Sequence, residues 1–460
     1  MSTRQEGAPS PVVQSRDDLA AWIAAGEKSA DRWRIGTEHE KFVYNTGTLT
    51  PVPYDGPRGI RALMEALIAR HGWQPIREGD NIIALRRPEG EPGATVSLEP
   101  GGQFELSGAP LETLHATAAE TEQHLKEVRG IGEHLGICFL GLGFSPKWTL
   151  AETPQMPKER YGVMTRYMPR VGSRGLDMMY RTATIQVNLD FADEADMVKK
   201  LRVSLALQPV ATALFASSPF TEGKLNGFKS MRSEVWRDTD KARTGMLPFV
   251  FEPGMGYERY VDYALDVPMY FVYRDGRYID VAGASFRDFL AGKLTALDGE
   301  HPTIDDWSDH LTTLFPEVRL KRFLEMRGAD GGRWPRVCAL SAFWVGLLYD
   351  RDALEAAWDM VRSWTAEERE ALRQAVPRTA LATPFRGATV HALAIEVLGI
   401  SRGGLRRRRR LNGYSQDETI FLDALDEMAV SGRTVSDELI ARYAGPWQGK
   451  VDPVFTEFAF

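Results

Sequence analysis

The stretch RIGTEHEKFVY (Arg34 to Tyr44) has the composition of a β-strand and carries two glutamates, Glu38 and Glu40, two positions apart. Side chains at positions i and i+2 of a strand lie on the same face of a sheet. Two like charges held close together on a sheet destabilise it by roughly 0.2–1 kcal/mol. A divalent cation bound to both carboxylates would remove this repulsion, so the stretch suggests a metal site on the face of a sheet.

Other predicted strands also have one polar and one apolar face. Residues 94–99 and 103–108 are predicted as two strands joined by a Pro-Gly-Gly turn. The segments TATIQVNLD (182–190) and VRLKRFLEMR (318–327) are each predicted as one strand. The polar faces of these strands carry Glu99, Gln103, Glu105, Gln186, Asn188, Arg319, Lys321, Glu325 and Arg327.

Two explanations compete for these polar faces. An antiparallel sheet often has one face in water, and this is the ordinary explanation for any single strand. Solvated faces are usually rich in Lys and Thr, however, and they rarely repeat Glu. Carboxylate oxygens are the ligands that Mg²⁺ and Mn²⁺ prefer, and these ions also bridge to substrate phosphates. Taken together, the four strands favour a metal–phosphate site.

The order of the predicted elements favours an α+β protein with a mainly antiparallel sheet. Strands and helices follow one another without a regular βαβ rhythm, and Asp275-Gly276 between two aromatic strands predicts a hairpin with a type I′ turn. The pattern is helical from about residue 335 to residue 460. Residues 1–15 are expected to form a disordered lead-in, and residues 16–460 are expected to form one domain.

Two segments rich in charged residues are predicted as loops. The first, residues 220–245, lacks apolar periodicity, and long loops in compact domains are often functional. Arg232 in this segment is a candidate clamp for a substrate carboxylate, because a guanidinium binds a carboxylate through two hydrogen bonds; a loop-stabilising ion pair is the alternative. The second, MPKERYGVMTRYMPRVGSRGLDMMYR (156–181), is interpreted as a substrate-binding loop or a packed cover.

Composition and motifs argue against several classes of protein. The net charge of −7, from 56 basic and 63 acidic residues, argues against a general nucleic-acid binder. No apolar run approaches the ~18 residues that a membrane span needs. The chain has no GxxxxGK[ST] phosphate loop and no HExxH pairing. The five consecutive arginines at 406–410 are interpreted as a solvated helix end rather than as an RNA or anionic-membrane patch.

The cysteines and the N-terminal segment predict a location. Cys138 and Cys338 are too few for a disulfide framework, and their apolar surroundings predict buried thiols in a reducing compartment. The segment MSTRQEGAPSPVVQS has no apolar core of the length that a secretory signal needs. We therefore expect a cytoplasmic protein, a monomer or homodimer, whose partners are small molecules rather than nucleic acid or membrane.

Several long blocks of the sequence resemble the plant-type glutamate–cysteine ligases, a family of plants and many proteobacteria. Three such blocks are SLEPGGQFELSGAP (97–110), SSPFTEGKLNGFKSMRSEVW (217–236) and LFPEVRLKRFLEMRGADGG (314–332). The resemblance runs from about residue 20 to the C-terminal DPVFTEF. It implies a curved, mainly antiparallel sheet of the glutamine synthetase/guanidino kinase type. No plastid transit peptide is recognised, so the resemblance is read as that of a bacterial cytosolic enzyme.

The resemblance also implies an activity. Members of this family use ATP to join the γ-carboxylate of L-glutamate to the amine of L-cysteine through an acyl phosphate, with Mg²⁺ or possible Mn²⁺ as the metal. The product, γ-glutamylcysteine, is the first intermediate of glutathione biosynthesis. The residues from about 16 to 460 would then form a single catalytic domain.

Roles follow for individual residues by the same resemblance. Glu40 and Arg327 are expected to be catalytic, with Arg327 stabilising the transferring phosphoryl group; Arg327 and Lys321 are expected to contact the nucleotide. Arg232 is expected to hold the α-carboxylate of glutamate, and Gln186 to line the site. The expected metal ligands are Glu38, Glu40, Glu99, Glu105, Glu325 and Asn188. The candidates for the cysteine pocket are Tyr161, Arg166, Tyr167 and Met168.

Three alternatives remain open at this point. The ligase could use another amine acceptor, or its dipeptide could feed ergothioneine synthesis. The chain could be a non-catalytic nucleotide-binding relative, although such a protein has no reason to keep crowded carboxylates. A kinase that phosphorylates a guanidino group is disfavoured by the length of the resemblance.

Overall fold

A single large antiparallel sheet forms the centre of the protein. The computed structural model describes residues 10–88, 90–91 and 93–460. Within these residues, the strands of the main sheet follow the order β14-β15-β7-β1-β5-β4-β3-β2, and β6 pairs with the far half of β1. Their bounds are β1 (Ile35–Asn45), β2 (Gln74–Glu78), β3 (Asn81–Arg86), β4 (Thr95–Leu98), β5 (Phe104–Ser107), β6 (Ile137–Leu140), β7 (Thr184–Leu189), β14 (Val318–Leu320) and β15 (Leu324–Asp330).

Strand β1 organises this sheet. Its first half pairs with β7 on one side and β5 on the other, and its residues 42–45 pair with β6. All of these pairings are antiparallel, and almost every residue of β1 is buried. The α+β class with a mainly antiparallel sheet is therefore confirmed. The strand predicted from RIGTEHEKFVY is the central strand of the molecule.

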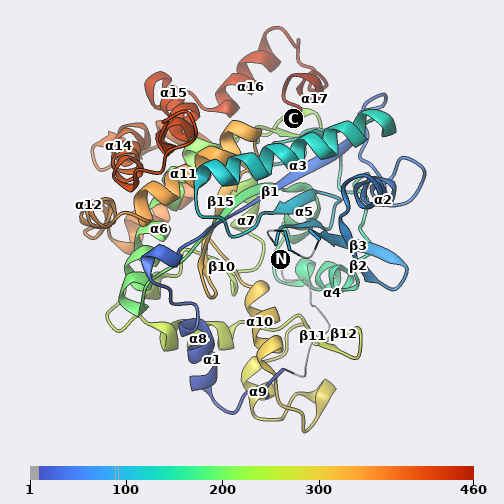
Figure 1. Cartoon of the computed structure of the whole chain (residues 1–460), viewed down its shortest axis with the longest axis vertical. Helices are drawn as coiled ribbons and strands as arrows, with labels where there is room; N and C mark the ends of the chain where they lie inside the picture. Colours follow the sequence, from blue (N-terminus) through green and yellow to red (C-terminus); the bar gives the residue numbers. More distant parts are fainter. Residues whose placement is uncertain (1–9, 89, 92) are drawn as a thin grey trace.

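Helices cover one face of the sheet and leave the other for a cavity. The covering helices are α3 (Leu114–Leu135), α6 (Glu194–Phe215) and α11 (Trp334–Leu348), and Figure 1 shows α3 running along the sheet. Thr37 of β1 points to this side, where its hydroxyl lies 2.7 Å from that of Ser341 on α11. His39 also points to this side and packs edge-on against His124 of α3. Because side chains alternate along a strand, Glu38 and Glu40 point to the opposite face.

Local sequence signals explain where the covering helix α3 begins and ends. The Thr113 side chain accepts a hydrogen bond from the backbone N–H of Ala116, which caps the N-terminus. Gly136 ends the helix with φ = 67°, a left-handed conformation that glycine adopts without steric strain. The cap at Thr113 and the glycine at 136 therefore fix the two ends of the helix.

The rest of the chain lies at the two ends of the sheet. Figure 1 shows α1 (Arg16–Ala24), α8 (Tyr257–Asp266), α9 (Phe286–Leu290), α10 (Ile304–Thr312) and the hairpin β11–β12 at one end. In Figure 1 the helices α14 (Val390–Arg408), α15 (Asp423–Ser431), α16 (Val435–Ala444) and α17 (Val454–Glu457) lie toward the other end. The other two C-terminal helices are α12 (Arg351–Val361) and α13 (Ala366–Thr379). Remaining helices are α2 (Ile60–His71), α4 (Glu159–Tyr167), α5 (Gly175–Arg181) and α7 (Met231–Trp236). Small strand pairs complete the structure: β8 (Phe220–Thr221) with β9 (Lys224–Leu225), β10 (Thr244–Gly245) with β13 (Phe315–Pro316), β11 (Phe271–Arg274) with β12 (Arg277–Asp280), and β16 (Pro384–Phe385) with β17 (Ala388–Thr389).

Two predictions from local patterns agree with the structure. The residues between β11 and β12, Asp275 and Gly276, have φ values of 47° and 80°, and positive φ at both positions is what a type I′ turn requires. The arginine run 406–410 lies at the C-terminus of α14, where Arg407 pairs with Asp350 and Arg408 with Glu418. Among the described residues, no helix is both long enough and apolar enough to cross a membrane.

Three predictions about the elements are wrong. The segment 318–327 is two strands, β14 and β15, because the backbone turns at residues 321–323, where Lys321 N–H donates to the Phe323 carbonyl. The two predicted loops contain the short helices α4, α5 and α7, which are stabilised by their buried faces rather than by strong local signals. Residues 10–15 of the predicted lead-in are ordered, since Val12 forms a β-bridge with Thr303; residues 1–9 lie outside the described part of the chain.

Candidate active site

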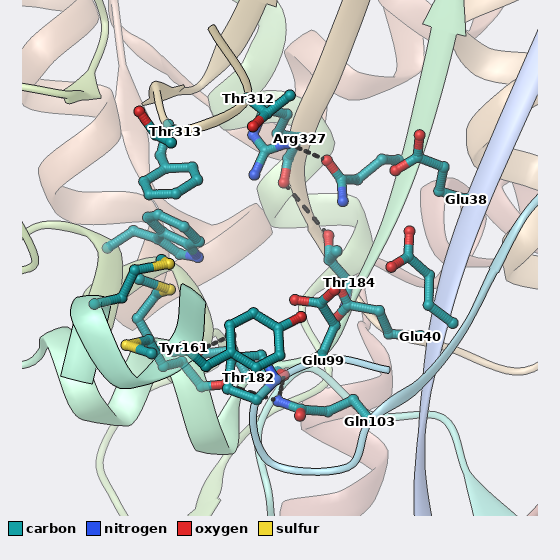
Figure 2. A pocket seen from close by; sticks show the side chains of 18 of the residues that line it. Glu38, Glu40, Glu99, Gln103, Tyr161, Thr182, Thr184, Thr312, Thr313 and Arg327 are labelled. Atoms are coloured by element: carbon teal, nitrogen blue, oxygen red, sulfur yellow. Dashed lines mark hydrogen bonds between the residues drawn. The ribbon is translucent and has the colours of Figure 1, made fainter. Parts of the chain in front are cut away.

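A cavity that opens to solvent lies on the sheet face that carries Glu38 and Glu40, and its volume is ≈ 850 Å³ when the open part is included. Its walls come from seven stretches of the sequence: 38–40, 99–105, 160–164, 178–186, 232–236, 271 and 312–327. Figure 2 shows Glu38, Glu40 and Glu99 on one side of this space, with Tyr161 and Arg327 around it. The polar and charged residues of the lining are Glu38, Glu40, Glu99, Gln103, Glu105, Arg160, Tyr161, Thr182, Thr184, Gln186, Arg232, Thr312, Thr313, Arg319 and Arg327. The apolar ones are Pro100, Met164, Met178, Met179, Trp236, Phe271 and Phe315.

Strand register brings the carboxylates of Glu38, Glu40 and Glu105 together. Glu40 of β1 lies directly opposite Glu105 of β5, and Glu38 lies opposite Gln186 of β7. The Glu40 carboxylate accepts a hydrogen bond of 3.0 Å from the backbone N–H of Thr184. The hydroxyls of Ser97 and Ser107 donate to the Glu105 carboxylate at 2.9 and 2.8 Å. Among the described residues, the donors to Glu40 and Glu105 are therefore a backbone amide and two serine hydroxyls rather than lysines.

Glu99 joins this group from the turn after β4. Gly102 makes the turn possible with φ = 82°, and Gly101 approaches the Tyr180 carbonyl so closely that a β-carbon there would lie 2.2 Å from its oxygen. One carboxylate oxygen of Glu99, Oε1, is buried without a hydrogen-bond partner. Burial and the neighbouring Glu105 raise the pKa of Glu99 to about 8.

Glu40 is subject to the same repulsion. Burial, together with Glu99 and Glu105, raises the pKa of Glu40 well above its usual value, although Arg232 opposes this. Carboxylates whose pKa values are raised by one another in a cavity are typical of functional sites. A cation placed among them would favour their ionised forms.

Glu325 has different surroundings from these carboxylates. It is fully buried, and its two oxygens receive Arg319 at 2.7 and 2.8 Å, Lys321 at 3.1 Å, and Arg327. Burial alone would raise the pKa of Glu325, but the three cations hold it well below the usual range. Glu325 and Lys321 do not line the cavity. The structure thus gives Glu325 the contacts of an ion-pair centre, and its predicted role as a metal ligand stays a prediction.

Arg327 and Gln186 are brought together at the rim of this ion-pair centre. The Arg327 guanidinium donates to the Gln186 side-chain oxygen at 2.5 Å, and both residues line the cavity. Asn188 lies one sheet position further on, donates to Glu38 at 2.8 Å and does not line the cavity. The Oδ1 atom of Asn188 is nevertheless buried without a partner. Its predicted ligand role is therefore untested.

Arg232 reaches the cavity from helix α7 and is 3% exposed. Its Nη2 donates to the backbone carbonyl of Arg327 at 2.7 Å, and its Nε has no hydrogen-bond partner. Burial lowers the pKa of Arg232, while the carboxylates of Asp330 and Glu40 oppose this effect. Arg232, which the sequence predicted to bind a substrate carboxylate, therefore lines the cavity and has an unused hydrogen-bond donor, Nε. Its alternative role as a loop-stabilising ion pair receives no support from these bonds.

The predicted cysteine pocket is only partly brought to the cavity. Tyr161 lines it, and its hydroxyl donates to the Leu98 carbonyl at 2.6 Å. Arg166 is exposed and pairs with Asp280 on β12, while Tyr167 and Met168 pack against Tyr270 in the protein interior. These last three are not cavity residues, because Arg166 and Tyr167 lie on helix α4 with their side chains turned away from the cavity and Met168 begins the 3₁₀ turn that follows it.

Sequence reasoning missed several lining residues. Arg160 and Met164 flank Tyr161 on α4, and helical periodicity would have grouped Tyr161 with Met164 had the helix been recognised. Figure 2 shows sulfur-containing side chains on the wall opposite the glutamates. Thr312, Thr313 and Phe315 come from the end of α10 and the segment after it. No local signal in the sequence marked this segment as part of the site.

The residues of the cavity can accommodate a metal ion together with a phosphorylated substrate. Among the described residues, no group of three or more His, Cys, Asp or Glu side chains is arranged to hold a metal ion by itself. Mg²⁺ in nucleotide sites is usually held by one or two carboxylates, waters and substrate phosphates rather than by a closed protein cage. The unpartnered oxygen of Glu99 and the raised pKa values of Glu40 and Glu99 fit such a shared site.

A mainly antiparallel sheet whose cavity is lined by both carboxylates and arginines has the charges that a phosphorylated substrate and a cation would need, as in phosphoryl-transferring enzymes. The family model for "glutamate-cysteine ligase family 2" matches residues 34–457, which include every residue that lines the cavity. The chain therefore belongs to the glutamate–cysteine ligase family 2. The resemblance seen in the sequence, and the expectation of an enzyme of this ligase family, are confirmed.

Curated plant proteins are similar to this chain over nearly its whole length. The chloroplastic glutamate–cysteine ligase of Brassica juncea is 57% identical over 446 residues, covering 97% of this chain and 84% of the relative. The corresponding protein of Arabidopsis thaliana is also 57% identical, over 97% of this chain and 83% of its own. Glutamate–cysteine ligase B of Oryza sativa subsp. japonica is 56% identical, over 97% and 87%.

These relatives correct the expected location. The sequence predicted a cytoplasmic protein, and this prediction is contradicted by the curated relatives, which are chloroplastic enzymes. The error arose because the number of cysteines and the composition of the first residues carry little information about the compartment of a protein.

The fold is also found in a solved structure. The glutamate–cysteine ligase of Francisella tularensis, determined in complex with AMP, aligns with a TM-score of 0.53 over 94% of this chain and 89% of its own. The sequence identity is 13%, so this comparison supports the fold alone.

Proposed function

We propose that the protein is an ATP-dependent glutamate–cysteine ligase that joins the γ-carboxylate of L-glutamate to the amine of L-cysteine. The observation that carries this proposal is the convergence of Glu38, Glu40, Glu99 and Glu105 with Arg232 and Arg327 around one cavity. The family and the names of the plant relatives support the same activity, and the AMP in the Francisella tularensis structure supports a nucleotide substrate. Residues 16–460 would act as one catalytic domain.

The two chemical steps explain why ATP is needed. A free carboxylate is a poor acyl donor because oxide would have to leave. In the first step a γ-carboxylate oxygen of glutamate attacks the γ-phosphorus of ATP, the bond to the β–γ bridging oxygen breaks, and ADP leaves. In the second step the cysteine amine attacks the acyl carbon, phosphate leaves, and the nitrogen loses a proton. The products are γ-glutamylcysteine, ADP and phosphate.

The arginines of the cavity suit the first step. Two anions, a carboxylate and a triphosphate, must approach each other, and guanidinium groups in a partly buried site reduce their repulsion. Arg232, with its unpartnered Nε, is assigned to the α-carboxylate of glutamate, and Arg327 to the transferring phosphoryl group. Removing such a preorganised donor typically costs ~10²–10³ in kcat.

The carboxylates of the opposite wall are assigned to a metal. Glu38, Glu40, Glu99 and Glu105 would hold Mg²⁺, with Mn²⁺ as the alternative, and Glu325 and Asn188 remain predicted ligands outside the lining. When bound, the ion would neutralise charge on the phosphate oxygens of ATP. Gln186 would orient substrate through its side-chain amide, which already accepts from Arg327.

The apolar wall suits the second step. Met164, Met178, Met179, Trp236 and Phe271 line the cavity on the side of Tyr161. An acyl phosphate is lost to water unless water is excluded, and an apolar wall serves that purpose. The same side chains offer a soft, apolar surface to the side chain of a small acceptor amino acid. We assign the acceptor subsite to this wall and to Tyr161.

A product assay tests the proposed function. The protein is incubated with Mg²⁺, ATP, glutamate and cysteine, and mass spectrometry with a synthetic standard identifies γ-glutamylcysteine and distinguishes it from the α-linked dipeptide. Omitting ATP, glutamate or cysteine should abolish the product. Absence of the dipeptide in the complete mixture, with the protein folded, would exclude the proposal.

Two further measurements define the reaction. With ¹⁸O in the γ-carboxylate of glutamate, one label should appear in the released phosphate, because the acyl phosphate transfers that oxygen. A panel of amines in place of cysteine, followed by phosphate release, tests whether cysteine is the preferred acceptor. A second amine with higher kcat/KM than cysteine would change the substrate assignment but not the class of reaction.

A further inference from the structure

A buried aspartate without an assigned role lies just behind the cavity. Asp330 ends strand β15, is 0% exposed and does not line the cavity. Its Oδ2 accepts from the backbone N–H of Ser217 at 2.9 Å and from the hydroxyl of Ser218 at 2.6 Å. Its Oδ1 accepts from the hydroxyl of Ser230 at 2.6 Å. The carboxylate therefore gathers three donors from the chain that leads into α7.

The two serine hydroxyls also hold the first turn of α7. The Ser230 oxygen caps the helix by accepting from the Ser233 N–H at 3.1 Å, and the Ser218 oxygen accepts from the Arg232 N–H at 3.3 Å. A hydroxyl has one hydrogen to donate. Because an ionised carboxylate only accepts, Asp330 takes both hydroxyl hydrogens and leaves the oxygen lone pairs for the helix.

The surroundings leave Asp330 little freedom to move. A β-carbon on Gly143 would lie 2.3 Å from the Asp330 carboxyl carbon, so only glycine allows this approach. Of the charges that oppose the effect of burial on the pKa of Arg232, Asp330 contributes most. The Arg232 guanidinium itself makes one hydrogen bond to the protein, to the Arg327 carbonyl, among the contacts of the described residues. Its position therefore depends on how the helix backbone is held.

We propose that Asp330 is a positioning residue for glutamate binding: through Ser218 and Ser230 it fixes the first turn of α7 and so places the Arg232 guanidinium at the cavity wall. This inference rests on the proposed function, because it takes Arg232 as the group that holds the α-carboxylate of glutamate. It predicts that loss of Asp330 weakens the binding of glutamate but not of ATP. A residue that only stabilises the fold would not have this selective effect.

Asp330→Asn tests the proposal kinetically. Asparagine keeps the shape, but its NH₂ group replaces one of the two accepting oxygens, so one of the two serine hydroxyls that hold α7 loses its acceptor. Loss of a hydrogen bond to a charged group corresponds to about a tenfold effect, so the KM for glutamate should rise about tenfold while the KM for ATP changes less than about twofold. Adding Asp330→Asn to Arg232→Lys should then raise the KM for glutamate no further.

Asp190→Asn is the matched control, since Asp190 is also buried at the end of a sheet strand, accepts from Lys28 and the Arg34 N–H, and does not line the cavity. It should lower thermal stability without selective loss of glutamate affinity.

If Asp330→Asn fails to fold, Ser230→Ala, which removes one of the bridges, should raise the KM for glutamate by about threefold. Equal changes in the KM values for glutamate and ATP, or additive effects in the double variant, would overturn the proposal.

Hydrogen exchange provides a readout that does not need activity. The backbone amides of Arg232 and Ser233 should exchange at least about tenfold faster in Asp330→Asn than in the wild type, and not in Asp190→Asn. Unchanged exchange would overturn the positioning role even if the protein makes no γ-glutamylcysteine. Faster exchange in Asp330→Asn, together with a wild type that forms no product, would support the positioning role and place the failure in the proposed function.

Discussion

The carboxylates of Glu40 and Glu325 have very different surroundings in the folded protein. Glu40 is partly buried among Glu99 and Glu105, with one backbone N–H as its hydrogen-bond donor, whereas Glu325 is fully buried among three cations. Residues whose placement disfavours their charged form, without a structural gain in return, are typical of functional sites. The two glutamates should therefore respond in opposite ways to neutral substitution.

Glu40→Gln should abolish function without harming the fold. We expect ligation to fall at least about 100-fold, which corresponds to about 2.7 kcal/mol of transition-state stabilisation. The melting temperature of the metal-free protein should stay the same or rise, because burial and two like charges disfavour the ionised carboxylate. Steady-state kinetics and differential scanning fluorimetry measure the two effects. Glu133→Gln, at an exposed position of α3, is the control, and near-normal turnover of Glu40→Gln would refute the role of Glu40.

Glu325→Gln, in contrast to Glu40→Gln, should lower the free energy of unfolding. Removing one partner of a buried ion pair leaves uncompensated charges, here Arg319, Lys321 and Arg327, and typically costs about 3–5 kcal/mol. Urea unfolding followed by tryptophan fluorescence should show this loss. An unchanged unfolding curve, combined with lost Mg²⁺ dependence, would favour the metal-ligand role predicted from the sequence.

At the scale of elements, most strands were predictable from the sequence, whereas the short helices and the turn that separates β14 from β15 were not. Strand β1 follows from alternation and β-forming residues, and the hairpin β11–β12 from Asp275-Gly276. Helix α7 has six residues, too few to be stable alone, and it exists because Ser230 caps it and the protein buries its face. Because Arg232 lies on this helix rather than on a loop, the position of its side chain at the cavity depends on the helix.

Helix α10 carries a buried histidine, His310, and ends at the cavity, where Thr312 and the following Thr313 line the wall. Protonation of this histidine should therefore affect the stability of a helix that shapes the site. Burial lowers the pKa of His310 on this helix to about 4, while its hydrogen bond to the Ala264 carbonyl opposes the shift. The unfolded chain binds this proton near pH 6.5, so stability is lost as the pH falls from about 6.5 to about 4, by up to about 3 kcal/mol.

His310→Gln should remove this acid-induced loss, since the amide can still donate to the Ala264 carbonyl but does not titrate. Thermal melts between pH 4 and pH 7.5 measure the effect, with His134→Gln at an exposed position as the control. Parallel pH profiles for the wild type and His310→Gln would contradict the prediction.

At the scale of the whole molecule, the helical C-terminal part and the sheet share one hydrophobic core. Ala339, Phe343 and Trp344 of α11 belong to the same buried cluster as Val187 of β7 and Leu205 of α6. The chain also returns to the sheet at its end, where the Tyr44 hydroxyl of β1 donates to the Phe455 carbonyl of α17. This arrangement supports the proposal of a single domain.

A fragment that ends at residue 334 should therefore not fold. It would expose the apolar faces of β7 and α6, each buried Leu, Val or Phe side chain losing roughly 1.5–3 kcal/mol of burial. Limited proteolysis should degrade the fragment under conditions in which the full chain resists, and near-ultraviolet circular dichroism should show no fixed tertiary structure. A stable, protease-resistant fragment would show that the C-terminal helices form a domain of their own.

The sequence by itself determined the strands, the shared face of Glu38 and Glu40, and the ligase family, because alternation, turn residues and long matching blocks are read along the chain. The tertiary structure alone decided which polar side chains meet. It brought Glu40 opposite Glu105, enclosed Glu325 among cations, and added Thr312, Thr313 and Phe315 to the cavity. The physical reason is that side-chain periodicity is local, whereas strand register and helix packing depend on burying the apolar surface of the whole molecule.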